Sequence, residues 1–98
     1  MILPIRLLPE ARVELNDAVD WYQRQRAGLG SKFFAQVQAV FNRIAANPQL
    51  HAQVYGPVRK AAVRRYPYVV LSREEAGEVV VISVFHTSRD PSIWQARA

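Results

Sequence analysis

Apolar and polar positions at the start of the chain alternate with the two-residue period of a β-strand. Leu3, Ile5 and Leu7 are separated by Pro4 and Arg6, which predicts a short strand. Proline cannot donate to a central ladder, so Pro4 places this strand at a sheet edge or at a strand start.

The pattern then changes to two helical stripes. Pro9 suits the first turn of a helix, and apolar residues recur there at three- and four-residue steps. The 28–30 segment, Gly-Leu-Gly, ends this helix, and Ser31 is expected to cap the next one. Asn47-Pro48 ends the second helix. The connecting loop is short, which favours an antiparallel helical hairpin. The stripes are Leu8, Ala11, Leu15, Ala18 and Tyr22, followed by Phe33, Val37, Val40, Phe41 and Ile44.

The second half of the chain carries three valine-rich strand patterns. They span residues 58–65, 68–73 and 78–86, with a turn at 74–77 and a bend at Tyr66-Pro67. Links of this length predict an antiparallel meander. We therefore expect a single domain over residues 1–98, of α+β class and β-α-α-β-β-β order. Its N-terminal strand and helical hairpin would pack on one face of a small, mostly antiparallel sheet.

The last predicted strand is apolar on both of its faces. Strict alternation puts Val80, Ile82 and Val84 on one face, and Val79, Val81 and Phe85 on the other. A helical hairpin covers one face of a sheet, so the other needs its own cover. The C-terminal tail with Ile93 and Trp94, a second copy and a partner protein are the three alternatives. We expect a partner on the face of Val79, Val81 and Phe85.

Charge and composition narrow the class of partner. The 98-residue chain has a net charge of +5 and a pI near 10.2, which favours an acidic partner. It has no cysteine, as is common in a reducing cytoplasm. The longest apolar run, residues 79–85, is far shorter than the ~20 residues of a membrane-spanning helix. We read no signal peptide and expect a cytoplasmic protein with no membrane association.

A basic run with interleaved aromatics lies in the predicted sheet. Alternation puts Lys60 and Arg64 on one face, and Arg59 and Arg65 on the other. Such a surface can hold nucleic acid through phosphate contacts and base stacking. Alternatively, the arginines extend past the core to water. The run comprises Arg59, Lys60, Arg64, Arg65 and Arg73, with Tyr55, Tyr66 and Tyr68 in or beside it.

Catalytic and cofactor motifs are sparse. The two histidines, His51 and His86, show no metal-ligand spacing, so we expect no metal and no cofactor. His86 follows the last strand, where it could be a general acid or base or have a structural role. Asp90 could orient His86 or cap a turn with Pro91. No glycine-rich phosphate loop or nucleophile motif is visible.

Three stretches of the chain resemble the toxins of the ParE/RelE superfamily. They are LLPEARVELNDAVDWYQRQRAGLGSKF, RRYPYVVL and VISVFHTSRDPSIWQAR, which together span nearly the whole chain. The resemblance implies the component of a bacterial type II toxin–antitoxin pair that arrests growth when free and forms a hetero-oligomer with its antitoxin. Its ParE-like branch poisons DNA gyrase without known catalytic residues. Its RelE-like branch cuts messenger RNA on the ribosome, with basic sheet residues and a C-terminal tyrosine or histidine.

The sequence departs from the RelE-like pattern and so favours the ParE-like branch. Tyr68 stands where that branch commonly has arginine, Ala61 and Ala62 replace alternating lysines, and Trp94 cannot transfer a proton. We therefore expect no catalytic residue; the alternative, an mRNA endonuclease, would use His86, Arg89, Arg59 and Lys60. Residues expected to bind antitoxin or target are Arg59, Lys60, Arg64, Arg65, Tyr68, Arg73, Val79, Val81 and Phe85.

We interpret the final HTSRDPSIW segment, residues 86–94, as a structural clamp. Trp94 is expected to fold back on the sheet or the hairpin, because a tryptophan buries ~200 Å². Asp90-Pro91 would set the turn. Arg89 is expected to pair with Asp90 or with a carboxylate of the first helix such as Asp17 or Asp20. Trp21 and Tyr22 of that helix are also assigned structural roles.

Overall fold

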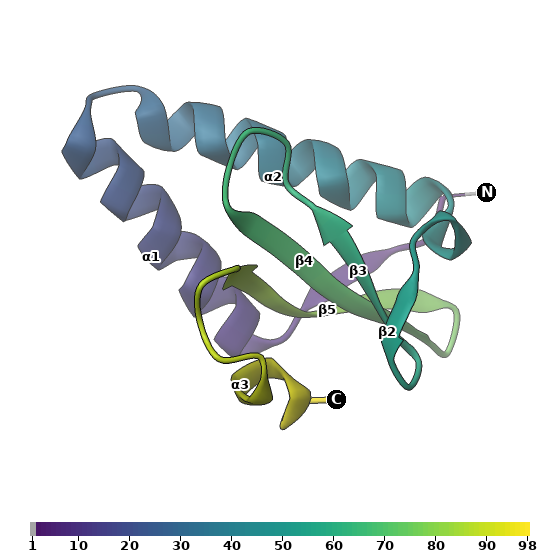
Figure 1. The fold of residues 1–98 in the computed structure, drawn as a ribbon. Helices are drawn as coiled ribbons and strands as arrows, with labels where there is room; N and C mark the ends of the chain where they lie inside the picture. The colour runs from purple at the N-terminus through teal and green to yellow at the C-terminus, as the bar shows by residue number, and fades with distance from the viewer. Residues whose placement is uncertain (1) are drawn as a thin grey trace.

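The computed structural model describes residues 2–98 and has the predicted α+β fold. A short strand and two long helices precede four strands and a final helical turn (Figure 1). The elements are β1 (Ile5–Leu7), α1 (Pro9–Gln25), α2 (Leu29–Ala46), the 3-10 turn η1 (Pro48–Leu50), β2 (Gln53–Tyr55), β3 (Val58–Ala62), β4 (Tyr68–Glu75), β5 (Glu78–His86) and α3 (Ser92–Gln95).

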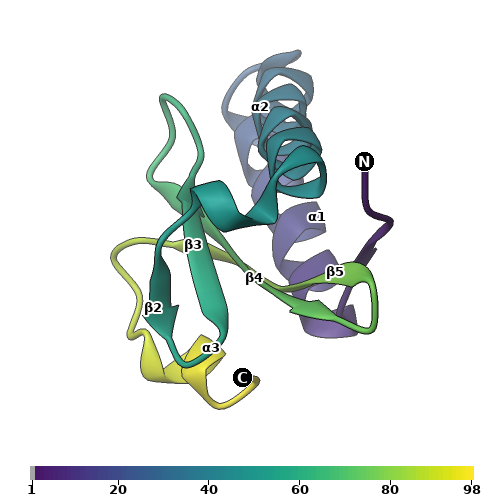
Figure 2. The same ribbon diagram turned by 90° about the vertical axis from the view of Figure 1, so that its right-hand side faces the viewer.

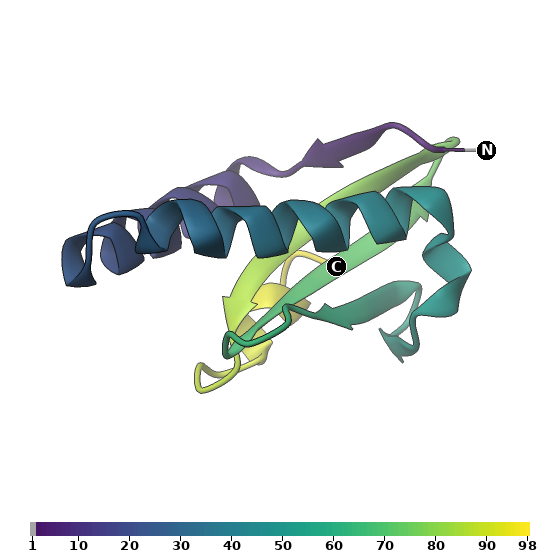
Figure 3. The same cartoon turned by 90° about the horizontal axis from the view of Figure 1, so that it is seen from above.

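The strands form one mixed sheet in the order β1-β5-β4-β3-β2. β1 pairs with β5 in parallel, and the other neighbours are antiparallel. Figure 3 shows β1 beside β5 at one edge and β2 at the other. The edge position of β1 agrees with the prediction from Pro4. The sequence pattern missed β2, a three-residue strand whose side chains are all exposed.

The helical hairpin covers one face of the sheet (Figure 2). Its turn contains Gly28 at a φ of 87°, a left-handed conformation that suits glycine. Ser31 does not cap α2, because the helix begins two residues earlier, at Leu29. Instead the Gln23 side chain of α1 accepts hydrogen bonds from the Gly28 and Gly30 amides, at 3.1 and 3.2 Å. The two helices are therefore joined by a side-chain cap.

The strand β3 ends earlier than the basic run predicted. β3 ends at Ala62, and Arg64 and Arg65 lie in the turn before β4. Arg65 has a φ of 72°, which a strand residue does not have. Their assignment to opposite strand faces is therefore wrong. The β4–β5 connection is as predicted, with Ala76 and Gly77 both at positive φ in a tight turn.

A β-bulge changes which residues of β5 share a face. Leu71 pairs with Ser83 and Ser72 with Val81, so Ile82 is the extra residue. An extra residue reverses the alternation beyond it. Two predicted faces are corrected as a result. Val79, Val81 and Val84 pack in the cluster under the helices, whereas Val80, Ile82 and Phe85 pack in the cluster on the opposite face.

Both faces of the sheet are covered by the chain itself. The larger core contains the buried stripes of α1 and α2, including Ala11, Leu15 and Phe33. On the other face, Trp94 of α3 packs with Val58 and Leu71 in a second cluster. The expectation of an open apolar face is therefore wrong, and the C-terminal tail is the alternative that the structure shows. Within residues 2–98, no helix combines the length and apolarity needed to span a membrane.

Candidate functional site

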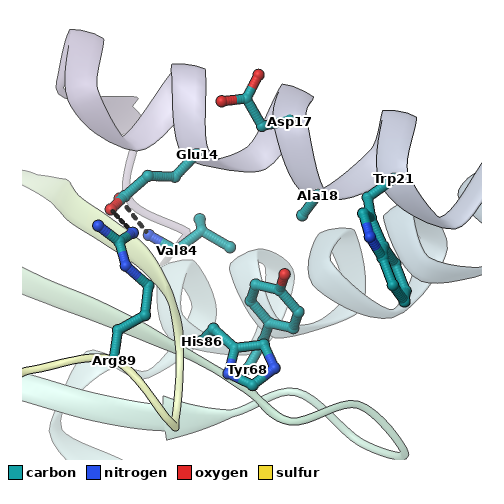
Figure 4. Close-up of a pocket in the computed structure, with 8 residues that line it drawn as sticks. All are labelled: Glu14, Asp17, Ala18, Trp21, Tyr68, Val84, His86 and Arg89. Carbon is teal, nitrogen blue, oxygen red and sulfur yellow. Dashed lines mark hydrogen bonds and ion pairs between the residues drawn. The ribbon is translucent and has the colours of Figure 1, made fainter.

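A groove runs along α1, where the helix faces β5 and the loop that follows it. Its central pocket, of about 240 Å³, lies between α1 and the ends of β4 and β5 (Figure 4). An adjoining depression of about 430 Å³ shares Trp21, Tyr68 and His86 with it. A third, of about 460 Å³, shares Glu14, Asp17 and Arg89 and extends toward Pro9. The groove therefore has a charged half and an aromatic half.

Glu14 organises the charged half. Its carboxylate accepts hydrogen bonds from the Ser83 hydroxyl at 2.8 Å and the Val84 amide at 3.3 Å. Arg97 donates to both carboxylate oxygens, at 2.8 and 3.1 Å, and Arg89 approaches within 3.4 Å. β1 ends at Leu7, so the carboxylate occupies the edge of β5 that β1 leaves free. This one side chain connects α1, β5 and the C-terminal tail.

Neither Glu14 nor Arg97 was expected from the sequence. Arg89 does pair with a first-helix carboxylate, but with Glu14 rather than Asp17, Asp20 or Asp90. A signal was nevertheless present. Glu14 lies three residues after Ala11 and four before Ala18, on the buried stripe, where a carboxylate needs partners. Ser83 was the matching signal, because it is a polar residue inside an apolar strand and donates to this carboxylate.

His86 lies in the aromatic half of the groove, on the helix side of the sheet. Its ring meets the Tyr68 ring edge-on, with centroids 5.0 Å apart. Its Nδ1 accepts a hydrogen bond from the Ser88 amide at 3.1 Å and lies 2.8 Å from the Ser88 hydroxyl. An Nδ1 that accepts from an amide leaves the proton on Nε2 in neutral imidazole. In that tautomer the Nε2 N–H is a hydrogen-bond donor.

Tyrosines surround this end of the groove. Burial raises the pKa of Tyr22, and the nearby phenols of Tyr68 and Tyr66 raise it further. Burial also raises the pKa of Tyr68, with Arg89 opposing the shift. Both phenols are therefore neutral at physiological pH. Tyr22 also packs on Phe33, with ring centroids 4.8 Å apart, which joins the groove to the core.

The predicted basic run does not form one surface. Arg59 donates to the His51 carbonyl at 2.7 Å and so anchors the segment before β2. Lys60 is exposed on the opposite face, beside Trp94. Arg73 pairs with Glu75 at 3.1 Å. The two turn arginines, Arg64 and Arg65, are exposed at the β3–β4 turn.

The three apolar residues expected to bind a partner lie in the core. Val79, Val81 and Phe85 are all at most 2% exposed. The first two lie under the helices, and Phe85 lies in the cluster with Trp94. The helical hairpin covers Val79 and Val81, and the C-terminal tail covers Phe85, so neither face waits for another molecule.

The residues expected to be structural differ in their burial. Trp94 is 6% exposed and meets Tyr55 edge-on. Asp90 accepts a hydrogen bond from the Ser92 amide at 2.9 Å, which lowers the pKa of its carboxyl and begins α3. Tyr22 is partly buried against the core. Trp21, in contrast, is half exposed and lines the groove.

The alternative catalytic set is brought together only in part, since His86 and Arg89 line one pocket. His86 and Lys60 lie on opposite faces of the sheet, in different pockets. Arg59 is bonded to the His51 carbonyl, and Arg89 is bonded to Glu14 while its guanidinium lies 5.0 Å from the centre of the Phe85 ring. Residues 2–98 contain no group of three His, Cys, Asp or Glu side chains placed to hold a metal ion.

Comparison with known families identifies the lineage of this fold. The model of a family described as "ParE toxin of type II toxin-antitoxin system, parDE" matches residues 5–91. This chain belongs to the ParE toxin family. The match covers β1 through the loop after β5, and therefore every residue that lines the aromatic half of the groove.

A solved structure agrees with the fold. A chain described as "Chromosomal ParDE TA system from P. aeruginosa" superposes with a TM-score of 0.77 and 13% sequence identity. The superposition covers 89% of this chain and 98% of that chain. At this identity the likeness concerns the fold. No curated protein matches the chain.

Proposed function

We propose that this ParE family member is a toxin that arrests growth in the cytoplasm by poisoning DNA gyrase, and that a cognate antitoxin neutralises it by binding. The family match over residues 5–91 is the observation that carries this proposal. A ParDE system pairs a toxin with an antitoxin, which makes a protein partner part of the proposal. Gyrase as the target follows from the ParE-like branch.

The dispersal of the basic and histidine side chains supports a toxin without its own catalytic centre. RNA cleavage needs charges that converge on one phosphate, and an acid–base pair. In this chain Lys60 and His86 face opposite sides of the sheet. The Nδ1 of His86 is engaged by Ser88, and Trp94 is buried in the apolar cluster. The toxin is therefore expected to act by binding.

Ribosome-dependent mRNA cleavage is the second candidate. The observation in its favour is the grouping of His86, Tyr68 and Arg89 around one pocket. Arg89 is, however, ion-paired with Glu14, and the unpaired carboxylate of Asp17 would repel a phosphate. This electrostatic environment favours the gyrase proposal.

The exposed cations are the proposed contact points for an acidic antitoxin segment. Lys60, Arg64 and Arg65 lie on β3 and its following turn, with Tyr68 at the start of β4. Arg59 and Arg73 contribute less freely, because each already bonds within the chain. Charge steers such an encounter, and apolar anchors supply the rest of the affinity.

Induction of the chain without its antitoxin tests the target. DNA, RNA and protein synthesis are measured separately in the minutes after induction. We expect DNA synthesis to fall first, with intact messenger RNA, and purified chain to trap cleaved DNA on gyrase. An immediate stop in protein synthesis with cut messages would contradict the gyrase proposal.

A His86→Ala variant separates the two candidates further. The ring is at the groove surface, so the variant should fold and should retain growth arrest. The matched control is Ser88→Ala, which removes the hydroxyl near Nδ1 and leaves the imidazole. Message cleavage by the parent that is lost in a folded His86→Ala protein would establish the endonuclease instead.

A further inference from the structure

The aromatic half of the groove has the composition of a site for an organic cation. Three aromatic residues, Trp21, Tyr68 and His86, line both the 240 Å³ pocket and the 430 Å³ depression. Trp21 is 50% exposed, although α1 packs its opposite side on the core. In Figure 4 its indole extends from α1 toward the sheet, with the small Ala18 one helical turn before it. A half-exposed indole in an aromatic pocket can contact a bound organic cation.

The charges around this pocket select the sign of the guest. Asp17 lies one helical turn before Trp21 and lines the same pocket. Within residues 2–98 its carboxylate has no ion pair. Arg89 is the cation among the lining residues, and it is bonded to Glu14 at the far end of the pocket (Figure 4). Asp17 is therefore the lining carboxylate that no cation of the described residues pairs with.

The acidic residues of the whole chain point the same way. Four of the eight lie on α1 between residues 10 and 20. Of these four, Glu14 forms an ion pair within the described chain, whereas Glu10, Asp17 and Asp20 do not. This part of α1 is therefore locally acidic, although the whole chain has a net charge of +5. An approaching cation would be favoured along this part of α1.

We propose that the pocket of Trp21, Tyr68 and His86, with Asp17 at its mouth, binds the guanidinium of an arginine side chain from a partner protein. A planar guanidinium stacks on aromatic faces and at the same time donates to a carboxylate. The chain already contains this combination, since Arg89 lies over Phe85 and bonds Glu14. The proposal is independent of the toxin's target, because its test uses the chain alone.

Fluorine NMR of the chain labelled with 5-fluorotryptophan tests the site directly. The two tryptophans give two resonances, and a Trp21→Phe variant assigns them. The probe is Nα-acetyl-arginine amide, titrated over a millimolar range. We expect the Trp21 resonance to shift saturably and that of the buried Trp94 to stay in place. Nα-acetyl-citrulline amide, which has the same shape without the charge, is expected to produce no saturable shift.

Two variants connect the binding to named groups. Asp17→Asn should weaken arginine binding by about two- to five-fold, as for an exposed ion pair. Asp20→Asn removes the same charge outside the pocket and should leave binding unchanged. Trp21→Leu keeps apolar bulk without the indole and should weaken binding by about ten-fold, read from the ring resonances of Tyr68.

Three outcomes would overturn the proposal. The first is no saturable shift of the Trp21 resonance with the arginine probe. The second is citrulline or Nα-acetyl-leucine amide binding as well as arginine, which would make the pocket a general apolar site. The third is equal effects of Asp17→Asn and Asp20→Asn, which would reduce the interaction to net charge. Loss of growth arrest, by contrast, bears on the proposed function and not on this site.

Discussion

Glu14 shows how much one side chain can organise at the residue scale. Its carboxylate accepts the Val84 amide hydrogen bond at the edge of β5, beyond the point where β1 ends. It also bonds Arg89 and Arg97, which follow it in the sequence by more than seventy residues. Its side chain is 11% exposed, so its charge is compensated by the surrounding donors rather than by water. The groove and the C-terminal tail depend on it together.

Replacement of Glu14 by alanine should destabilise the chain by about 2–3 kcal/mol. Removal of one partner of a buried ion pair costs ~3–5 kcal/mol, and the partial exposure of Arg97 reduces that cost. Urea melts measure the change. Glu10→Ala is the matched control, one turn earlier and exposed, and should change stability by less than about 0.5 kcal/mol. Equal effects of the two substitutions would show that the Glu14 contacts contribute nothing specific.

At the scale of elements, the short helix α3 covers one face of the sheet. α3 has four residues, yet its Trp94 closes the face of the sheet opposite the hairpin. A β-strand that is apolar on both faces requires two covers, and the chain supplies both. The groove is likewise a product of elements, since α1 extends past the end of β1 along the free edge of β5.

Trp94→Ala should destabilise the fold by roughly 3–5 kcal/mol, the range for truncating a large buried aromatic side chain. Its loss leaves a cavity beside Val58, Leu71 and Phe85. Trp21→Ala is the control with the same chemical change at a half-exposed position, and should cost far less. Denaturant melts of both variants give the comparison. A Trp94→Ala protein as stable as the parent would mean that the tail does not cover the sheet in solution.

Gly30→Ala tests the contact between α1 and α2. An added Cβ would lie 2.7 Å from the Val19 carbonyl oxygen and 3.0 Å from the Gln23 Cβ. Overpacking costs ~1–3 kcal/mol, and alanine's better helix propensity offsets up to about 1 kcal/mol of it. We expect a net loss of about 1–2 kcal/mol in thermal or urea unfolding. Ser31→Ala, at the next and exposed position, should be neutral or slightly stabilising, and a stabilised Gly30→Ala would contradict the close approach.

At the scale of the whole molecule, charge is unevenly distributed. The acidic residues concentrate on α1 and at the β4–β5 turn, whereas Lys60, Arg64 and Arg65 lie at β3 and its turn. The molecule therefore presents acidic residues along α1 and separate exposed cations on β3 and the turn after it. A partner that engages both regions would present a basic segment to α1 and an acidic segment to the cations of β3 and its turn.

Association with the antitoxin should depend on these exposed cations. Replacing Lys60, Arg64 and Arg65 by glutamine should slow association by about ten-fold at low salt, with a smaller effect on dissociation. The effect should shrink as ionic strength rises. The control replaces Arg24, Arg26 and Lys32, which lowers the net charge equally on the helical hairpin. Surface binding kinetics measure both rates; identical slowing in the two triple variants would show that net charge, rather than its location, steers the encounter.

The elements with strong periodicity were predictable from the sequence alone. Both helices, the hairpin between them, the edge strand and the last two strands each have a local signal: a 3.6-residue or two-residue repeat, or a Pro or Gly at a boundary. Those signals depend on neighbours within about four residues along the chain. The α+β class and the family resemblance followed from their order. β2 was missed because three exposed residues carry no periodic signal.

The faces of β5, the cover on each of them and the groove were decided only by the tertiary structure. The bulge at Ile82 arises from pairing with β4, and no pattern within β5 records it. The Glu14–Arg97 ion pair joins residues 83 positions apart, and Trp94 meets strands distant in sequence. The burial of a side chain and the identity of its ion-pair partner both depend on such long-range contacts. The amino-acid pattern could state that β5 needed two covers and that Glu14 needed partners, but only the fold could say which residues supplied them.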